Sequence, residues 1–273
     1  MNVTLSLRSG GLIGVSLSIW HKHMRKFLGN GEEMFGLMVQ PILWVVLFGV
    51  GMKSLMGGIA PDGGDSYIGF MLPGIIALSA MGGAIGGGMS WLDERVRGIV
   101  KEYLVAPIPR ISILLGNAGS TLTKALFQAV VILCVGVLMG AGLSDDPLSW
   151  FTGFLLLVGY SLGFTGLALM VASMTDDLQA YHAMIMLLNL PVLFLSNALY
   201  PMASLPGWMR IGALANPTSY LVDGIRQTIL SGGSGLATVD TLPLWLCFVV
   251  TTGFAVFGLT AATRAFAAKT ARG

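Results

Sequence analysis

Long apolar segments are the feature that most restricts the folds open to this chain. A helix needs roughly 20 apolar residues to cross a hydrocarbon core about 30 Å thick. Six segments have that length: Met34–Met56, Tyr67–Trp91, Ile111–Ala141, Trp150–Ser173, Leu178–Tyr200 and Leu242–Thr263. Lipid offers the backbone no hydrogen bonds, and the alternating pattern of a membrane barrel strand is absent, so these segments are expected to be helices. The sequence therefore predicts an all-α membrane protein with six transmembrane helices.

The charge content excludes several other classes. Only 10% of the 273 residues are charged, against roughly 25% in a soluble domain, so a soluble fold would lack polar residues to cover its surface. A net charge of +2 without a basic run that alternates with aromatic residues gives no reason to expect nucleic-acid binding. Cys134 and Cys247 lie inside apolar segments, and the histidines have no carboxylate or cysteine neighbours, so no metal site is expected.

Lysine and arginine predict the orientation, because loops on the cytoplasmic side of a membrane are enriched in both. With six spans, the two termini and the loop at 93–110 share one side. Eleven of the fifteen basic residues fall on that side: Arg8, Lys22, Arg25, Lys26, Arg95, Arg97, Lys101, Arg110, Arg264, Lys269 and Arg272. Both termini and the 93–110 loop are therefore predicted to be cytoplasmic.

Residues 1–33 are predicted to form a region separate from the transmembrane domain at 34–273. An apolar stretch is followed by a cluster of Lys, Arg and His, the reverse of a signal peptide, and it is too short to cross the membrane. We expect an amphipathic helix in the cytoplasmic interface, with Trp20 and Phe27 as anchors and the basic residues near anionic headgroups. A disordered tail is the alternative.

The segment at 201–232 is too hydrophobic for a solvated loop and is interrupted by Pro201, Pro206 and Pro217. We expect short re-entrant helices in the outer leaflet, where irregular backbone must pack against protein or line a cavity. Asn216 before Pro217 is typical of a helix start. Asp223 and Arg226 are three residues apart, so they can form an ion pair on one helix face.

The segment at 92–108 is the long charged stretch in the middle of the chain. As a helix over Asp93–Val105, it would place its apolar residues near one face and Glu94, Arg97 and Lys101 along another. Pro107 and Pro109 would then make a rigid exit into the third span. The residues alone are equally compatible with a solvated loop that contains an interfacial helix.

Catalytic motifs are absent or out of place. The stretch GYSLG, Gly159 to Gly163, matches the serine-hydrolase pattern but lies inside an apolar span, so it is interpreted as small residues for close helix packing. The G-x-x-x-G spacings Gly82/Gly86, Gly83/Gly87 and Gly136/Gly140 are interpreted in the same way. The chain contains no G-x-x-x-x-G-K-[ST] phosphate loop, so nucleotide hydrolysis would require another polypeptide.

Three function classes are weighed against one another. Ionisable side chains within membrane spans mark ion and proton pathways. The expected spans contain only Lys124 and, at the rim of the first span, Lys53. A gradient-driven secondary transporter or channel is therefore the weaker alternative to a transport subunit driven from outside the membrane. A membrane hydrolase that uses Ser161 is the third and weakest.

Two motifs resemble the ABC-2 type permeases, the membrane subunits of ATP-binding-cassette exporters of the daunorubicin-resistance kind. The first comprises Glu94-Arg95, Gly98, Tyr103-Leu104, Ala106-Pro107-Ile108 and Arg110, followed by ISILLGN. The second is ANPTSYLVDGIRQTIL, Ala215 to Leu230. Their order and spacing, together with the expected layout of helices, extend the resemblance over nearly the whole chain.

The resemblance implies a structural role for each motif and a partner protein for this chain. The 92–108 segment would be a coupling helix whose Glu94, Arg97, Gly98, Lys101, Glu102 and Pro107 meet a nucleotide-binding ABC ATPase subunit. Asn216, Pro217, Asp223 and Arg226 would belong to the re-entrant exit region, and Lys124 is a candidate pathway residue that the family pattern does not explain.

The resemblance also implies an assembly and a location. Two permease chains, as a homodimer or heterodimer, would join two ATPase subunits that bind ATP and Mg²⁺, and this chain itself would need no cofactor. The path would lie at the permease interface, lined by the first, second and fifth spans. The expected location is the cell (inner) membrane of a bacterium or archaeon, and the expected function is export of a drug, lipid or glycoconjugate, as in multidrug efflux.

Overall fold

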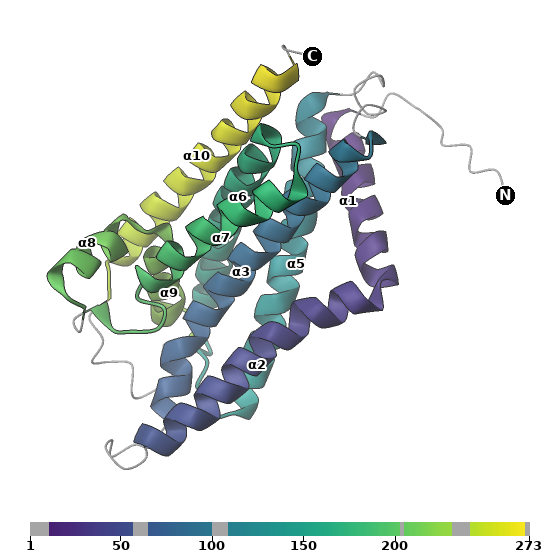
Figure 1. Cartoon of the computed structure of the whole chain (residues 1–273). Coiled ribbons are helices and arrows are strands. Elements are labelled where there is room, and N and C mark those ends of the chain that lie inside the picture. Colours follow the sequence, from purple (N-terminus) through teal and green to yellow (C-terminus); the bar gives the residue numbers. More distant parts are fainter. Residues whose placement is uncertain (1–10, 57–64, 100–108, 203–204, 231–240, 271–273) are drawn as a thin grey trace.

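The computed structural model describes residues 11–56, 65–99, 109–202, 205–230 and 241–270, and most of these residues are helical (Figure 1). The helices are α1 Leu12–Gly29, α2 Gly31–Met56, α3 Asp65–Val96, α5 Arg110–Leu138, α6 Pro147–Met174, α7 Leu178–Phe194, α8 Gly207–Ala215, α9 Pro217–Gln227 and α10 Leu244–Thr270. The all-α prediction is confirmed for this part of the chain.

Five of the described helices are long and apolar enough to cross a membrane: α2, α3, α5, α6 and α10. The fifth expected span, Leu178–Tyr200, is shorter than predicted, because α7 has 17 residues and ends at Phe194. At 1.5 Å per residue such a helix is about 25 Å long. The chain leaves the helix at Leu195, and Ser196, Asn197 and Ala198 are buried in the turn that follows. The six-span count is therefore not confirmed.

Helix α3 is the central helix of the bundle. Most of its apolar window is buried, and it packs against α2, α5, α6, α7 and α9 (Figure 1). The main apolar core lies along α3 and includes Leu72 and Ile76, which are almost fully buried. The outward faces of α2 and α10 remain apolar and exposed, for example at Leu47 and Val256, as expected of helices that face lipid.

Helices α6 and α10 make the closest contact in the bundle, and glycines allow it. A Cβ atom built on Gly166 would lie 2.6 Å from the backbone nitrogen of Leu259, and one on Gly258 would lie within 3.0 Å of Gly163. Both distances are too short for a side chain. The interpretation of GYSLG as a packing surface is confirmed, because Gly159 and Gly163 both face α10.

The glycine pairs of α3 do not all have the expected role. Gly87 faces Thr121 of α5 so closely that a Cβ would collide with its side chain. A Cβ on Gly82 or Gly86 would meet nothing within 4 Å, so the described part of this chain shows no close helix packing at that pair. These two glycines keep one face of α3 open instead.

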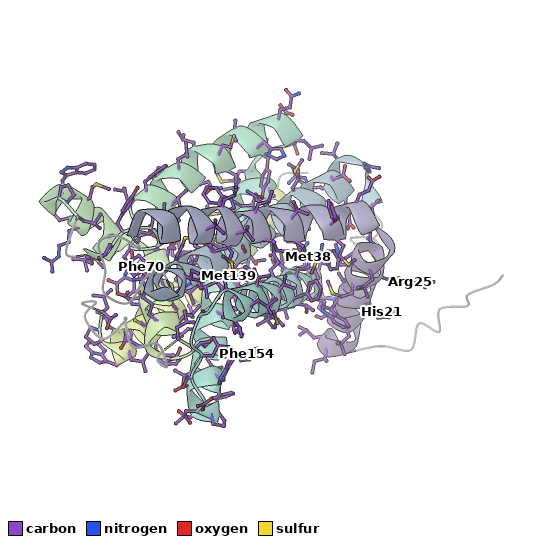
Figure 2. The ribbon with its side chains drawn as sticks, turned by 90° about the horizontal axis from the view of Figure 1, so that it is seen from below. His21, Arg25, Met38, Phe70, Met139 and Phe154 are labelled. Atoms are coloured by element: carbon purple, nitrogen blue, oxygen red, sulfur yellow. The ribbon has the colours of Figure 1, made fainter. Side chains whose placement is uncertain are left out.

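The N-terminal segment is helical as predicted, and α1 packs on α5. Trp20 Nε1 donates to Thr123 Oγ1 at 3.0 Å, and the rings of Phe27 and Phe127 meet edge to face with centroids 6.5 Å apart. His21 and Arg25 are exposed and lie at the edge of the molecule (Figure 2). The location of α1 in a membrane interface stays a prediction.

Candidate functional site

A large groove of about 760 Å³ lies between α2, α3, α5 and α7 and is called here the central groove. Gly36 of α2 and Gly82 and Gly83 of α3 form part of its wall, so small residues create much of its width. The polar and aromatic side chains in the lining are Gln40, Trp44, Ser79, Gln128, His182 and Asn189. The rest of the lining is predominantly apolar, so the groove suits a molecule with both polar and apolar parts.

Gln128 is the buried polar residue of the central groove. It comes from the middle of α5, where its side-chain nitrogen donates to the backbone oxygen of Leu37 at 2.8 Å and so joins α5 to α2. The residue is only 4% exposed, and its Oε1 accepts no hydrogen bond from any described residue. A buried acceptor without a donor is costly, which makes this oxygen a candidate contact for a bound molecule.

Lys124, the candidate pathway residue, is held away from the groove. Its Nζ lies 2.6 Å from Glu33 Oε1 and 4.7 Å from the centre of the Phe27 ring. It does not line the central groove. The ion pair and the ring contact instead tie α5 to the junction of α1 and α2, and a pathway role stays a prediction.

Asp223 and Arg226 form the predicted ion pair, and both are buried in α9. Arg226 Nη1 donates to Asp223 Oδ1 at 3.2 Å, and the two side chains are 2% and 0% exposed. Arg226 also donates to the backbone oxygens of Phe70 and Asn197 at 3.0 and 2.8 Å, and its guanidinium lies 3.9 Å from the centre of the Phe70 ring. Asn197 Nδ2 donates to the same Asp223 oxygen at 2.6 Å.

This network joins four segments of the chain at the end of the bundle that carries α8 and α9. Its members come from α3, the turn after α7, α9 and the residues just before α10, where the Leu242 backbone nitrogen donates to Asp223 Oδ2 at 3.1 Å. The described residues thus satisfy both charges internally. The arrangement indicates a structural role at this end of the bundle.

Asn216 begins α9, as predicted. Its side-chain oxygen accepts from the Thr218 backbone nitrogen at 3.0 Å, and its side-chain nitrogen donates to the backbone oxygens of Val192 and Leu195, each at 2.7 Å. Pro217 occupies the first helical position, where a missing N–H costs nothing. The same residue therefore caps α9 and holds the end of α7.

The charged segment after the second span departs from the predicted single helix over Asp93–Val105. Helix α3 continues to Val96 and then ends in a turn, because Gly98 has a φ of +82°, a conformation that favours glycine. Glu94 and Arg97 therefore belong to the end of α3. Lys101, Glu102 and Pro107 lie outside the described residues.

Glu94 and Arg97 face different surroundings. The Glu94 carboxylate is buried and accepts from Lys22 Nζ of α1 at 2.7 Å. Arg97 is 69% exposed and pairs with Asp93 one turn earlier, at 2.8 Å. Arg97 is thus open to a partner, whereas Glu94 positions α1 against α3.

Arg95 holds the end of α6, although sequence reasoning used it only as part of a motif and of the cytoplasmic charge count. Its guanidinium donates to the backbone oxygens of Ala172, Ser173 and Thr175 at 3.0, 3.2 and 2.6 Å, and to the Asp176 carboxylate. Carbonyls at a helix C-terminus lack partners inside the helix, so an arginine stabilises them. The sequence signal for this role of Arg95 was a basic residue at the end of a helix. The carbonyls that it contacts lie about 80 positions away in the sequence, so they could not be identified from it.

A pH dependence is expected at His23, which α1 buries beside Glu94. Burial lowers the pKa of His23 below its ordinary value of 6.5, nearby lysines act in the same direction, and Glu94 opposes them. His23 therefore binds a proton more readily when α1 is released from α5 than when α1 is packed against it. Acidification below about pH 6.5 thus favours release of α1. Hydrogen exchange of α1 amides, corrected for intrinsic rates, is expected to become faster as the pH is lowered from about 7.5 to about 5.5.

The control for this expectation is His23→Gln, which removes the titrating group. The variant is expected to lose most of the acceleration. An unchanged pH response in His23→Gln would assign the effect to other groups, such as the Lys22–Glu94 pair.

Comparison with known proteins identifies relatives for most of the chain. The family described as ABC-2 type transporter matches residues 16–230. The chain is 32% identical over 193 residues to ycf38 of Cyanophora paradoxa, by name a transport permease, with 69% of this chain and 65% of the relative covered. It is 26% identical over 194 residues to YbhR of Escherichia coli (strain K12), by name a multidrug ABC transporter permease, covering 71% of this chain and 52% of the relative.

A third relative matches over a longer stretch. The inner membrane transport permease YadH of Escherichia coli (strain K12) is 24% identical over 238 residues, which are 85% of this chain and 89% of YadH. The chain thus spans just under two thirds of ycf38, about half of YbhR and most of YadH.

Proposed function

Because the chain belongs to the ABC-2 type transporter family, we propose that it is the permease subunit of an ATP-driven exporter that moves a hydrophobic or amphiphilic molecule outward across the cell membrane. The observation that carries the proposal is the central groove, a large cavity of mixed polarity inside a bundle of membrane-length helices. Such a cavity accommodates an amphiphile without a continuous charged path.

The groove is lined by α2, α3 and α7, the helices that correspond to the first, second and fifth expected spans, with Gln128 of α5 at its floor. In the proposed assembly a second permease chain, identical or homologous, covers the open side of the groove. The path then runs between the two chains.

Energy would come from a separate pair of nucleotide-binding subunits that bind ATP and Mg²⁺, since the sequence contains no phosphate loop. We place their contact at the end of α3 and in the 100–108 segment, on the cytoplasmic side. Glu94, Arg97 and Gly98 are the described residues of the predicted contact, and of the two charged ones Arg97 is exposed whereas Glu94 is buried. Lys22–Glu94 and Arg95 would hold this contact to α1 and α6, so that a movement of the partner reaches both helices.

Reconstitution tests the proposal. Permease and its ATPase subunit, placed together in proteoliposomes, are expected to move an uncharged amphiphilic dye such as 4-methylumbelliferyl β-D-glucoside only when ATP and Mg²⁺ are present on the side of the 93–110 segment. Permease alone is expected to move none. Movement by the permease alone under a proton or ion gradient would contradict the proposal and favour the gradient-driven transporter.

Charge reversal at Arg97 tests the coupling contact. Arg97→Glu is expected to reduce dye-stimulated ATP hydrolysis by about tenfold, because an exposed favourable charge contact becomes repulsive. Arg264→Glu is the matched control, because Arg264 is also exposed, at the same end of the bundle, in α10. Equal losses in both variants, or none in Arg97→Glu, would place the contact elsewhere.

A further inference from the structure

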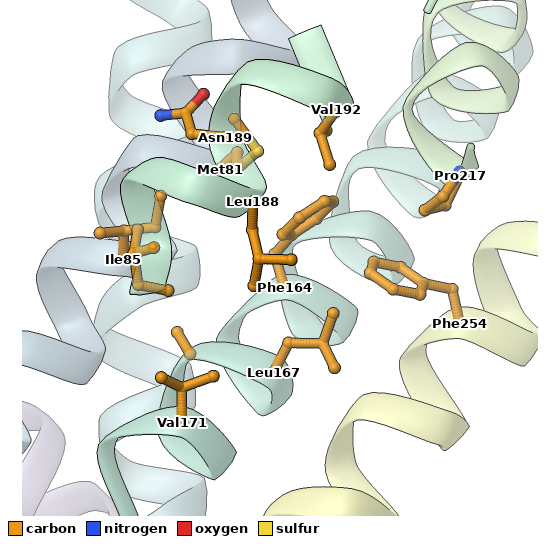
Figure 3. A pocket seen from close by; sticks show the side chains of 12 residues that line it. Met81, Ile85, Phe164, Leu167, Val171, Leu188, Asn189, Val192, Pro217 and Phe254 are labelled. Atoms are coloured by element: carbon orange, nitrogen blue, oxygen red, sulfur yellow. The ribbon is translucent and has the colours of Figure 1, made fainter. Parts of the chain in front are cut away.

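A second cavity lies on the other side of α7 from the central groove. It has a volume of about 140 Å³ and lies between α3, α6, α7, α10 and Pro217 at the start of α9 (Figure 3). Phe164 and Leu167 of α6, Leu188 of α7 and Phe254 of α10 surround it, and Asn189 is the polar residue of its lining. The cavity is open on one side, and its volume is close to the roughly 150 Å³ of an enclosed apolar cavity that binds benzene, so this chamber has room for one ring-sized apolar group.

The groove and the chamber adjoin each other. Both are lined by Met81, Ile85, Ile185 and Asn189, so α7 and the facing turn of α3 are the partition between them. Within α7, Tyr181 and Ile185 are the buried residues, and most of its other side chains are exposed. Asn189 lies at the boundary, where a molecule would change from polar to apolar surroundings.

The lining of both cavities selects against charge. None of the described residues that line them is Asp, Glu, Lys or Arg. An ion placed there would lose its hydration without gaining a counter-charge. The unpartnered Gln128 Oε1 instead requires an N–H or O–H donor.

We propose that the central groove and the chamber are two halves of one binding site for an uncharged amphiphile. A hydroxyl- or amide-bearing part lies in the groove and donates to Gln128 Oε1, and a single ring-sized apolar group passes Asn189 into the chamber. The proposal rests on the proposed function, in which the groove is the path, and it narrows the cargo to uncharged molecules with one ring-sized apolar end.

Photolabelling tests the site with 4-azidophenyl β-D-glucoside, which joins an uncharged polyhydroxyl group to one ring. Light releases N₂ from the azide, and the resulting nitrene inserts into a neighbouring C–H or N–H bond. The full chain in phosphatidylcholine nanodiscs is labelled without nucleotide, and the adducts are located by mass spectrometry. Adducts are expected at Phe164–Val171 and next to Phe254, and excess phenyl β-D-glucoside is expected to suppress them.

Three variants locate the two halves. Leu167→Trp fills the chamber and is expected to lower labelling by about tenfold or more, the loss that follows when a ring is no longer buried. Leu155→Trp makes the same change on an exposed face of α6 and is expected to leave labelling unchanged. Asn189→Leu removes a polar group at the boundary and is expected to lower labelling by about two- to tenfold. Thermal unfolding of each variant checks that it folds.

Two further probes are used. One tests whether membrane lipid occupies the chamber, and the other tests whether the site excludes a charged ligand. A phosphatidylcholine with the aryl azide at its acyl end is expected to label lipid-facing residues, and a trimethylammonium analogue of the glucoside is expected to label the chamber weakly. Chamber adducts from the lipid probe that phenyl β-D-glucoside does not displace would overturn the proposal. Equal labelling by the cationic analogue, or undiminished labelling of Leu167→Trp, would also overturn it.

The result is independent of the proposed export. Labelling needs neither ATP nor the ATPase subunit, so its failure would remove the bipartite site and leave ATP-driven transport to its own assay. Failure of transport, in turn, would leave a positive labelling result intact as evidence for a ligand site of another kind.

Discussion

Replacing Arg226 by leucine is expected to lower the free energy of unfolding by about 3 to 5 kcal/mol, enough to leave much of the chain unfolded. The substitution leaves the Asp223 carboxylate buried without its counter-charge. It also removes the donors to the backbone oxygens of Phe70 and Asn197, which then lie buried without these hydrogen bonds. Unfolding in detergent micelles, followed by circular dichroism, measures the change.

The double variant Asp223→Leu/Arg226→Leu separates charge from packing. It removes both charges and is expected to be more stable than Arg226→Leu, because no unpaired carboxylate remains. Arg210→Leu is the control, since Arg210 is exposed on α8 at the same end of the bundle, and its effect is expected to stay within about 0.5 kcal/mol. A double variant that is no more stable than Arg226→Leu would contradict the account.

Gly258→Val is expected to destabilise the bundle by at least about 3 kcal/mol, at the upper end of overpacking effects. The added side chain would lie within 3.0 Å of the backbone of Gly163, and backbone cannot move aside as a flexible side chain does. Helices α6 and α10 would have to separate and lose the tightest interface in the bundle. The yield of folded protein and its midpoint of thermal unfolding report the effect.

Gly253→Val is the matched control on the same helix. A Cβ on Gly253 meets nothing within 4 Å, so this variant adds the same side chain to an open face. Its stability is expected to match that of the original protein or exceed it slightly, because glycine lowers helix propensity. Comparable losses in both variants would show that a valine side chain anywhere on α10 is destabilising, and that the α6–α10 contact is not responsible.

Sequence reasoning was most successful where the signal is local. The apolar segments predicted the long helices to within five residues at each end, except that α7 ends six residues early and α10 ends seven residues late. Asn216 before Pro217 marked a helix start, and the spacing of Asp223 and Arg226 predicted their ion pair. In these cases the physical cause acts within one helical turn, so the residues that reveal it are neighbours in the chain.

Contacts between distant segments were missed or assigned a different role. Glycine spacing is the same at Gly82/Gly86 and Gly83/Gly87, yet only the second pair includes a glycine pressed against another helix. Glu94 was chosen for a partner contact, and the structure places it in a buried pair with Lys22. Spacing states which residues share a helix face, but it does not state which neighbour, if any, that face meets.

The sequence by itself determined the class of the molecule: a membrane protein of long apolar helices, with a helix near its N-terminal end and short helices before the last span. Hydrophobic length and local capping are properties of contiguous residues, so they are readable along the chain. Only the tertiary structure decided that Gln128, Trp44 and His182 line one groove, that Lys124 is paired with Glu33, and that Arg95 holds the end of α6. These placements depend on how helices rotate and pack against one another, which is set by the complementary shapes of side chains far apart in the sequence.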